Sequence, residues 1–335
     1  MNSGFKKNTG INTHFFAICL GTCLTFVSCI EKIDIPDEFY TENFVLNSVL
    51  EPDSAIRVNI SKSLPPAGVI EFEFVSDAIV EIKPTSSEQE ILCEYDSSGW
   101  YSHSGFVLHT GTEYAIRVVL EDASELSSAT VIPSKPTVKD VMIENDSVYF
   151  SIVDDPNKPQ YYIVSLMGYN HTYDLVQLPD NSHEEIWKYE YQALRLESND
   201  ASIDAFLYNR VGRVNNATGF TFTDDFFELA PDYTGDAFLI SDETFQGESK
   251  EFLMKITERG LWYIDSIRSV DLLVHSIDYN YYQYLLTFAQ YWTTEETPFT
   301  VRAKVYNNIV GGYGILGSQN GVKAEMTLPD VLFEE

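Results

Sequence analysis

Apolar and polar residues alternate in short runs between Phe44 and Pro133, and this alternation restricts the fold more than any other feature of the sequence. In the run Thr112–Leu120, every second residue from Tyr114 onward is apolar or aromatic, so one face of an extended chain is suited to burial. Turn-forming residues separate similar runs at residues 44–50, 56–61, 78–82 and 91–95. Because no helical period lies between these runs, the sequence predicts an antiparallel β-sandwich of about a hundred residues.

The region after Pro136 contains further strand patterns and one helix pattern. Strand-like runs occupy residues 148–153 and 161–166, and the alternation of Trp187, Tyr189 and Tyr191 indicates another strand. A helix is predicted from Asp278, which is suited to cap it, to Thr293. One face of this helix carries five residues at helical spacing, namely Tyr281, Tyr284, Leu285, Phe288 and Trp292. We interpret this aromatic stripe as core packing against a sheet.

The first 29 residues have the pattern of a lipoprotein signal peptide. Lys6 and Lys7 precede an apolar run at residues 15–27, which is shorter than the ~20 residues needed to span a bilayer. The run ends in Phe26-Val27-Ser28-Cys29, which resembles a bacterial lipobox, where a small residue precedes a cysteine that receives two acyl chains. We predict cleavage before Cys29, lipidation of Cys29 as a diacylglyceryl-cysteine, and anchoring of the mature chain to a membrane.

These patterns predict a mostly β protein with four segments. Residues 1–28 are the lipoprotein signal peptide, and residues 29–40 are a lipidated tether. Residues 41–135 are an N-terminal antiparallel β-sandwich, Ig-like or prealbumin-like, which ends at the Pro133–Pro136 step. Residues 136–335 are a larger β-rich C-terminal domain with one or two helices.

Charge and cysteine content exclude several classes of protein. The 51 Asp and Glu residues outnumber the 21 Lys and Arg residues, and the formal net charge is −30. Nucleic acid would repel such a chain, so we exclude nucleic acid as a partner. Apart from Cys29, the mature chain retains only Cys93, so it cannot form an internal disulfide. Because no histidine is near it in the sequence, Cys93 is interpreted as a buried, inert thiol.

A glycine string near the C-terminus matches a dinucleotide-binding pattern. The string runs from Gly312 to Gly317, but no helix is expected after it, because Ser318-Gln319-Asn320-Gly321 is typical of a turn. We interpret its glycines as positions for a bulge or a tight bend, and we expect no cofactor.

Acidic residues gather between Thr221 and Phe245, and the weak candidates for Ca²⁺ binding among them are Asp232, Asp236 and Asp242. Their spacing does not match an EF-hand calcium loop, so we prefer a solvated acidic loop and assign no metal site.

The sequence motifs of zinc-dependent and serine-dependent hydrolases are missing. We assign no catalytic residues and predict that the protein is not an enzyme.

Five groups of residues occur in a fixed order along the chain: Ser98–Tyr101 followed by Gly111–Tyr114, Asp154–Pro156 with Tyr161–Tyr162, Ile240–Gly247, Tyr281–Trp292 and Tyr306–Gly317. In this order they resemble a family of Bacteroidota lipoproteins of unknown function, whose genes commonly lie beside TonB-dependent outer-membrane receptors. The resemblance covers nearly all of residues 29–335. It implies an outer-membrane location, at the cell surface, with a TonB-dependent receptor as partner, and it carries over no catalytic residues.

We therefore expect a non-catalytic accessory lipoprotein that binds or caps a TonB-dependent receptor during nutrient uptake. One alternative is a glycan- or peptide-binding module that acts alone through exposed aromatic side chains, such as those of Trp187, Trp262 or Trp292. Another alternative is an unrecognised hydrolase, which would need a cleft with paired carboxylates and at least one strongly shifted pKa.

Overall fold

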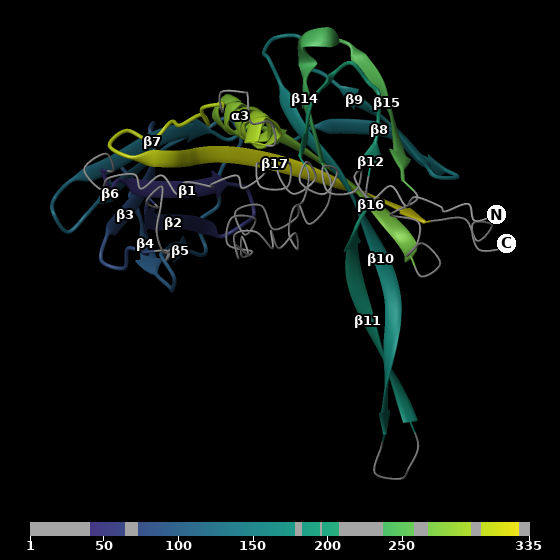
Figure 1. The fold of residues 1–335 in the computed structure, drawn as a ribbon, viewed down its shortest axis with the longest axis horizontal. Coiled ribbons are helices and arrows are strands. Elements are labelled where there is room, and N and C mark those ends of the chain that lie inside the picture. Colours follow the sequence, from purple (N-terminus) through teal and green to yellow (C-terminus); the bar gives the residue numbers. More distant parts are fainter. Residues whose placement is uncertain are drawn as a thin grey trace, which may run out of the picture. The chain divides into compact units, whose positions relative to one another are not determined.

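The computed structural model describes residues 41–63, 73–177, 183–194, 196–207, 237–257, 267–295 and 303–327. All of these except Thr41 belong to one compact unit, which comprises residues 42–64 and 71–335. The predicted signal peptide and tether, including Cys29, lie outside the described residues, as do Asp232 and Asp236. The fold is mostly β, as predicted, with one α-helix in the described part of the chain (Figure 1).

Seven strands occupy the region predicted to be a β-sandwich. They are β1 (Phe44–Leu50), β2 (Ile56–Lys62), β3 (Ile79–Pro84), β4 (Ile91–Tyr95), β5 (Trp100–His103), β6 (Glu113–Val119) and β7 (Glu125–Val131). Their pairing order is β1-β2-β5-β4-β3-β6-β7, and every pair among them is antiparallel. The alternating pattern therefore predicted this region correctly.

The remainder of the described chain contains ten more strands, a 3₁₀ turn and a helix. They are β8 (Thr137–Glu144), β9 (Ser147–Val153), β10 (Tyr161–Gln177), β11 (His183–Ala193), β12 (Leu196–Glu197), β13 (Ile203–Leu207), β14 (Ala237–Ser241), η4 (Asp242–Thr244), β15 (Ser249–Ile256), β16 (Ile267–Ile277), α3 (Tyr279–Glu295) and β17 (Tyr313–Thr327). A four-stranded sheet has the order β12-β15-β9-β8, while β13-β14-β10-β16-β17 continues directly into β1 of the sandwich.

Strand β17 joins the sandwich to the sheet of the C-terminal region. Its first half pairs in parallel with β1, from Val45 opposite Tyr313 to Leu50 opposite Ser318. Its second half pairs antiparallel with β16, from Ile277 opposite Gln319 to Ser269 opposite Thr327. The predicted boundary at residue 135 stays a prediction, but the last described strand of the chain completes the sheet that the first one begins.

The turn predicted at residues 318–321 is wrong, because these residues lie in the middle of β17. The side chains of Ser318 and Asn320 are buried and bond to the end of β7 and the segment that follows it. The Ser318 hydroxyl donates to the Val131 carbonyl oxygen at 2.8 Å, and the Asn320 amide donates to the Pro133 carbonyl oxygen at 3.0 Å. Because these bonds satisfy buried polar groups, a turn-like sequence is stable here as a strand. The Thr130 hydroxyl of β7 donates to the Ser318 hydroxyl at 3.0 Å, and we refer to Thr130, Ser318 and Asn320 as the polar seam.

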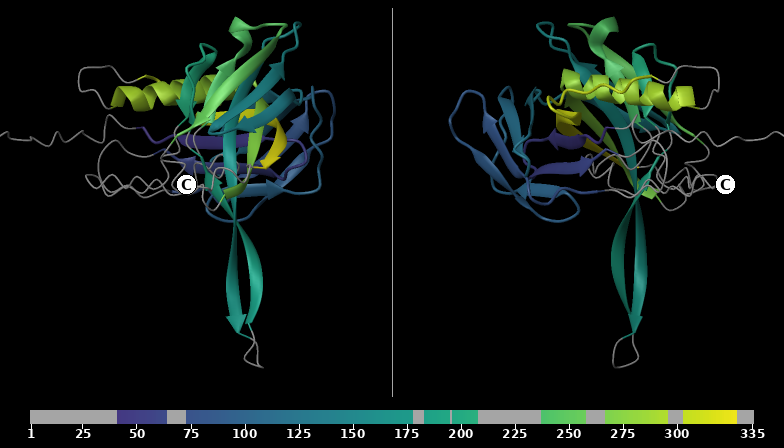
Figure 2. Two further views of the ribbon diagram at one scale, coloured as in Figure 1. Left: turned by 90° about the vertical axis from the view of Figure 1, so that its right-hand side faces the viewer. Right: turned by 60° about the vertical axis from the view of Figure 1, so that its left-hand side comes forward.

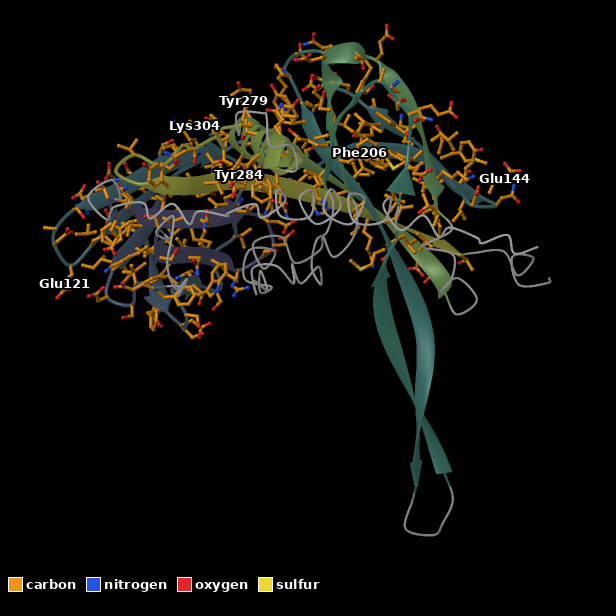
Figure 3. All side chains as sticks on the ribbon, in the orientation of Figure 1. Glu121, Glu144, Phe206, Tyr279, Tyr284 and Lys304 are labelled. Atoms are coloured by element: carbon orange, nitrogen blue, oxygen red, sulfur yellow. The ribbon has the colours of Figure 1, made fainter. Side chains whose placement is uncertain are left out.

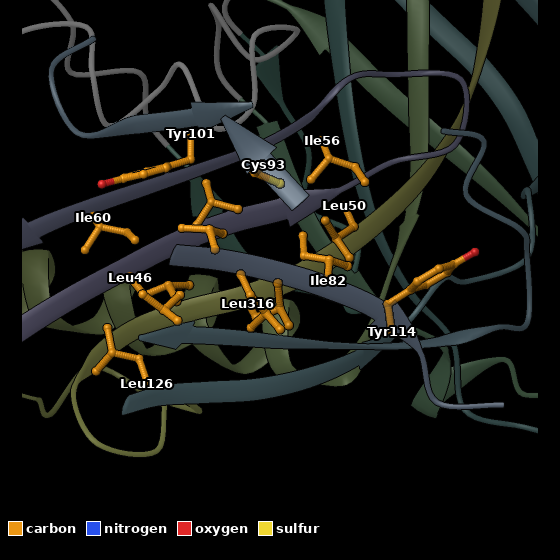
Figure 4. Packing of buried hydrophobic residues seen from close by; sticks show 14 of the residues in the cluster. Leu46, Leu50, Ile56, Ile60, Ile82, Cys93, Tyr101, Tyr114, Leu126 and Leu316 are labelled. Atoms are coloured by element: carbon orange, nitrogen blue, oxygen red, sulfur yellow. The ribbon is translucent and has the colours of Figure 1, made fainter. Parts of the chain in front are cut away.

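The sandwich core is built from strands at both ends of the chain (Figure 4). Leu46 and Leu50 of β1 are fully buried together with Leu316 of β17. Cys93 is only 4% exposed, and burial raises the pKa of its thiol to about 11, so it carries a proton at neutral pH. This confirms the prediction of a buried, inert thiol.

Helix α3 and the four-stranded sheet cover opposite faces of the sheet formed by β10, β14 and β16. Figure 2 shows α3 along one face, where Tyr281 and Tyr284 are buried against that sheet, as the aromatic stripe predicted. On the other face, Val164 of β10 packs with Phe150 and Phe252, whose rings stack at 5.3 Å. No helix in the described part of the chain is long and apolar enough to span a membrane.

Candidate functional site

Four tyrosines meet where α3 begins, and we refer to Tyr161, Tyr279, Tyr282 and Tyr306 as the tyrosine cluster. Tyr161 is the first residue of β10 and pairs with Ile277, the last residue of β16. The helix starts two residues later, so its first turn lies beside Tyr161. Tyr306 reaches the same place from the segment before β17, because its backbone N–H donates to the Thr287 hydroxyl of α3 at 2.8 Å.

Three rings of the cluster, those of Tyr161, Tyr279 and Tyr282, are joined by ring contacts, and one of them is open to solvent. Tyr161 and Tyr282 stack with their ring centroids 4.3 Å apart, and Tyr279 lies 5.7 Å from Tyr161 at an interplanar angle of 53°. Tyr282 is buried, and Tyr161 and Tyr306 are half-buried. Tyr279, which is labelled in Figure 3, is 54% exposed. Because Tyr279 contacts Tyr161, which itself stacks on the buried Tyr282, the exposed ring belongs to an aromatic platform.

Polar groups hold the buried parts of this platform in place. The Tyr282 hydroxyl donates to Asp204 Oδ2 at 3.0 Å, and the Tyr306 hydroxyl donates to Asn280 Oδ1 at 2.8 Å. Burial raises the pKa of Tyr161, Tyr282 and Tyr306, so these three rings remain neutral at physiological pH. Neutral tyrosine rings with hydroxyl donors stack on apolar ligand faces and accept cations over their π-systems.

Exposed carboxylates border the platform. Asp204 and Glu243 are both exposed, and Glu243 is close enough to contribute to the raised pKa of Tyr161 and Tyr282. Aromatic faces beside acidic groups suit a partner surface that presents apolar groups together with lysine or arginine.

Asp278 connects this site to the polar seam. Its carboxylate accepts the backbone N–H of Asn280 at 3.0 Å and of Tyr281 at 3.3 Å, which confirms the predicted helix cap. Its Oδ1 also accepts the backbone N–H of Ser318 at 2.8 Å. Burial raises the pKa of Asp278 to about 6 despite these bonds, because the charged form loses more solvation than the bonds return.

Asp278 is expected to make stability fall as pH rises from about 4 to about 6, because the folded protein binds a proton there that the unfolded chain has released. The contribution amounts to about 3 kcal/mol at most and is absent above that window. Urea unfolding of the wild type and of Asp278→Asn, which keeps a capping residue and cannot titrate, measures it. We expect the wild type to lose stability relative to the variant between pH 4.5 and pH 7.5. A difference that does not change with pH would contradict the assignment.

The buried carboxylates of the C-terminal region also hold the backbone in place. Asp154 accepts the Tyr162 hydroxyl at 3.1 Å and the Gly247 backbone N–H at 2.7 Å. Asp242, the one calcium candidate within the described residues, accepts the Gln160 backbone N–H at 2.8 Å, and burial raises its pKa. Both side chains are nearly inaccessible to solvent, and their hydrogen bonds hold the turn that contains Asp242 and Gly247 against β10. The described residues contain no group of three or more His, Cys, Asp or Glu side chains that could hold a metal ion.

A hollow of about 290 Å³ lies on the sandwich over β3 and β6, remote in sequence from these carboxylates. The polar residues that line it include Glu81 and Arg117, which form an ion pair with each other at 3.2 Å. Arg117 also pairs with Glu125, so its charge is already compensated within the protein.

The glycine string begins β17, and its glycines allow close approach between strands. Gly314 has a φ of +115°, and a Cβ at this position would overlap the carbonyl oxygen of Leu46 in β1. This agrees with the interpretation that the glycines serve backbone geometry.

The prediction that Trp187, Trp262 or Trp292 is exposed for glycan binding stays a prediction. Trp262 lies outside the described residues, and the structure describes the backbone but not the side chains of Trp187 and Trp292.

Strands β10 and β11 form a long antiparallel ribbon. Their register places Tyr169 opposite Tyr191, His171 opposite Tyr189, and Tyr173 opposite Trp187. Because strand residues alternate between faces, these six register positions share one face. The alternation of Trp187, Tyr189 and Tyr191 predicted β11, but the length of β10 and the pairing partners were not predicted.

The sequence matches the family described as domain of unknown function (DUF4249) over residues 30–325. The chain belongs to the DUF4249 family. No curated protein matches this DUF4249 chain.

Solved structures similar to this DUF4249 chain share little sequence with it. The FN1–FN3 domains of chicken CNTN1 match with 9% identity and a TM-score of 0.23, over 84% of this chain and 63% of that one. The chicken interferon gamma receptor alpha chain matches with 8% identity and a TM-score of 0.19, over 70% of this chain and 88% of that one. The chain therefore spans less than two thirds of the CNTN1 fragment, and no function is inferred from these similarities.

Proposed function

We propose that this DUF4249 protein is a non-catalytic, lipid-anchored accessory protein of the outer membrane, displayed at the cell surface. It binds or caps a TonB-dependent receptor during nutrient uptake. The lipobox at residues 26–29 supports the anchor, and the resemblance to Bacteroidota lipoproteins supports the partner.

The tyrosine cluster is the observation that supports a binding function. It presents an exposed ring, Tyr279, against Tyr161, which stacks on Tyr282, with carboxylates at its border. Aromatic anchors surrounded by polar groups are typical of the centres of protein interfaces. The carboxylate oxygens of the buried Asp154 and Asp278 accept hydrogen bonds from groups within the protein. This favours a binding function for the protein over a catalytic one.

Co-purification from detergent-solubilised membranes tests this function. We expect the tagged wild-type protein to recover a TonB-dependent receptor, and Tyr279→Ala to recover at least about tenfold less, because truncating an aromatic anchor costs roughly 2 kcal/mol or more. Tyr313→Ala is the matched control, because Tyr313 is similarly exposed at 50% but lies outside the cluster. Recovery of the wild-type protein free of any receptor would count against the proposal.

A glycan- or peptide-binding module that acts alone remains the alternative. The same exposed tyrosine favours it, because aromatic rings stack on apolar ligand faces. Binding of soluble glycans or peptides by the purified protein, without a receptor, distinguishes it from the first proposal.

A further inference from the structure

The four-stranded sheet has one face against the core and one face toward solvent. Phe150 and Ile152 of β9 are fully buried, and Tyr149, which alternates with them, is on the other face. Tyr149 pairs with Met142 of β8 on one side and with Leu253 of β15 on the other. Met142 is 50% exposed and Leu253 is 48% exposed, so these three residues form an apolar row on the solvent side. Contiguous exposed apolar residues indicate an interaction surface, whereas single ones need no explanation.

Four exposed charged residues surround the apolar row. On one side of it, Lys139 of β8 and Glu251 of β15 flank the same residue of β9. On the other side the order of the charges is reversed, with Glu144 on β8 and Lys255 on β15. Positive and negative charges therefore alternate around the row and sum to zero, in a chain whose formal net charge is −30. We refer to these four residues and the apolar row as the outer face.

Most of these charges are not neutralised inside the protein. Lys255 pairs with Asp146 at 3.2 Å and lies opposite Glu197 of β12, at the border of the outer face. The other three charged residues form no ion pair within the part of the chain that the structure describes. Their charges can therefore pair with charges on another molecule.

A second copy of this protein complements the outer face when the two sheets are aligned. A symmetric pair of aligned sheets has its two-fold axis either along β9 or along the apolar row. With the axis along β9, Lys139 faces Glu251 of the second copy, and Glu144 faces its Lys255. With the axis along the row, Lys139 faces Glu144 of the second copy, and Glu251 faces its Lys255. Either arrangement also places the apolar row on its own copy.

The other common way of packing two sheets, with strands crossed at about 90°, does not fit the outer face. Its two-fold axis lies along a diagonal of the four charges. One diagonal places Lys139 opposite Lys255 of the second copy, and the other places Glu144 opposite its Glu251. Like charges that face each other oppose association. The charges therefore select aligned packing.

We propose that the outer face binds a second copy of this protein in a two-fold symmetric dimer with aligned sheets. The apolar row forms the centre of the interface and the four charges form its rim. Because of the symmetry, every contact away from the axis occurs twice. This inference goes beyond the proposed function and requires no receptor.

Sedimentation velocity of the purified full chain, in an excess of detergent micelles, tests the proposal. We expect a monomer–dimer equilibrium between about 1 and about 100 µM, because a small interface with a polar rim binds weakly. Leu253→Asp places a charge near the centre of the interface twice and is expected to weaken dimerisation at least about tenfold. Leu92→Asp on β4 of the sandwich is the matched control, because Leu92 is similarly exposed at 55%. It is expected to leave dimerisation unchanged.

Exchange of all four charges tests the selection of a second copy. The variant combines Lys139→Glu, Glu144→Lys, Glu251→Lys and Lys255→Glu, which leave the net charge unchanged. We expect this variant to dimerise with itself within about threefold of the wild type, because its charges still alternate. Mixed dimers with the wild type are expected to be at least about tenfold weaker, because every facing pair would have the same sign. Fluorescence energy transfer between labelled chains measures both, and near-UV circular dichroism establishes that each variant keeps its fold.

Three results would overturn the proposal: a chain that stays monomeric up to about 100 µM, a dimer that Leu253→Asp does not weaken, or mixed dimers as stable as the unmixed ones. Failure of the proposal can be told from failure of the proposed function. If a receptor co-purifies with a monomeric chain, dimerisation is wrong and the accessory function stands. If the chain dimerises as expected while no receptor co-purifies, the reverse holds.

Discussion

Gly314→Ala is expected to destabilise the protein by about 2–5 kcal/mol in urea unfolding. Two costs add at this position. A φ of +115° is a conformation that alanine adopts with strain of about 1–2 kcal/mol. A Cβ would also overlap the carbonyl oxygen of Leu46, so β1 and β17 must move apart where they pair, at a further cost of about 1–3 kcal/mol.

Gly111→Ala separates these two costs. Gly111 has a φ of +76°, but nothing lies within 4 Å of a Cβ at that position, so only the backbone strain applies. We expect this control to lose about 1–2 kcal/mol. If both variants lost the same amount, the close packing of β17 on β1 would not be needed for stability.

Cys29→Ala is expected to move the protein almost completely from the membrane fraction to the soluble fraction. Each buried methylene of an acyl chain contributes about 0.8 kcal/mol, so two chains hold this acidic protein, whose full sequence has a net charge of −30, without help from basic residues. Fractionation after carbonate washing, followed by immunoblotting, measures the change, and mass spectrometry of the N-terminal peptide measures the lipid.

Cys23→Ala is the control for this experiment, because Cys23 lies in the same apolar run but outside the lipobox. It is expected to remain in the membrane fraction. A Cys29→Ala protein that stays membrane-bound would show that the apolar run itself, or a partner, provides the anchor.

Local patterns predicted the individual elements well. The runs at residues 44–50 and 91–95 coincide with β1 and β4, and the helix expected from Asp278 to Thr293 corresponds to α3 with Asp278 as its cap. These features depend on neighbouring residues, because alternation records which face of a strand is buried and capping needs only the first helical turn.

The path of β17 could not be predicted in this way. Ser318 and Asn320 resemble turn residues, yet each bonds to a carbonyl oxygen 187 positions away in the sequence. Without those partners, burial of the two polar side chains would be unfavourable, which is why the local sequence indicates a turn. The same bonds explain why residues 318–321 form a strand.

The tyrosine cluster was missed for a related reason. Tyr161 belongs to an alternating strand pattern and Tyr282 lies in the predicted helix, and neither position is unusual in its own segment. Their stacking depends on the pairing of β10 with β16, which brings the start of α3 beside the start of β10. Nothing in the local spacing of either segment records this contact.

The sequence by itself determined the mostly β class, the sandwich strands, the capped helix and the inert thiol of Cys93, and it supplied the lipobox on which the proposed anchor depends. Only the tertiary structure decided that β17 completes the sheet begun by β1, that Tyr161, Tyr279 and Tyr282 form one platform, and that β11 has one strand partner, β10, within the described chain. The physical reason is that periodicity specifies which face of an element must be buried, whereas the partner that buries it is chosen by hydrogen bonds and packing between residues distant in the sequence.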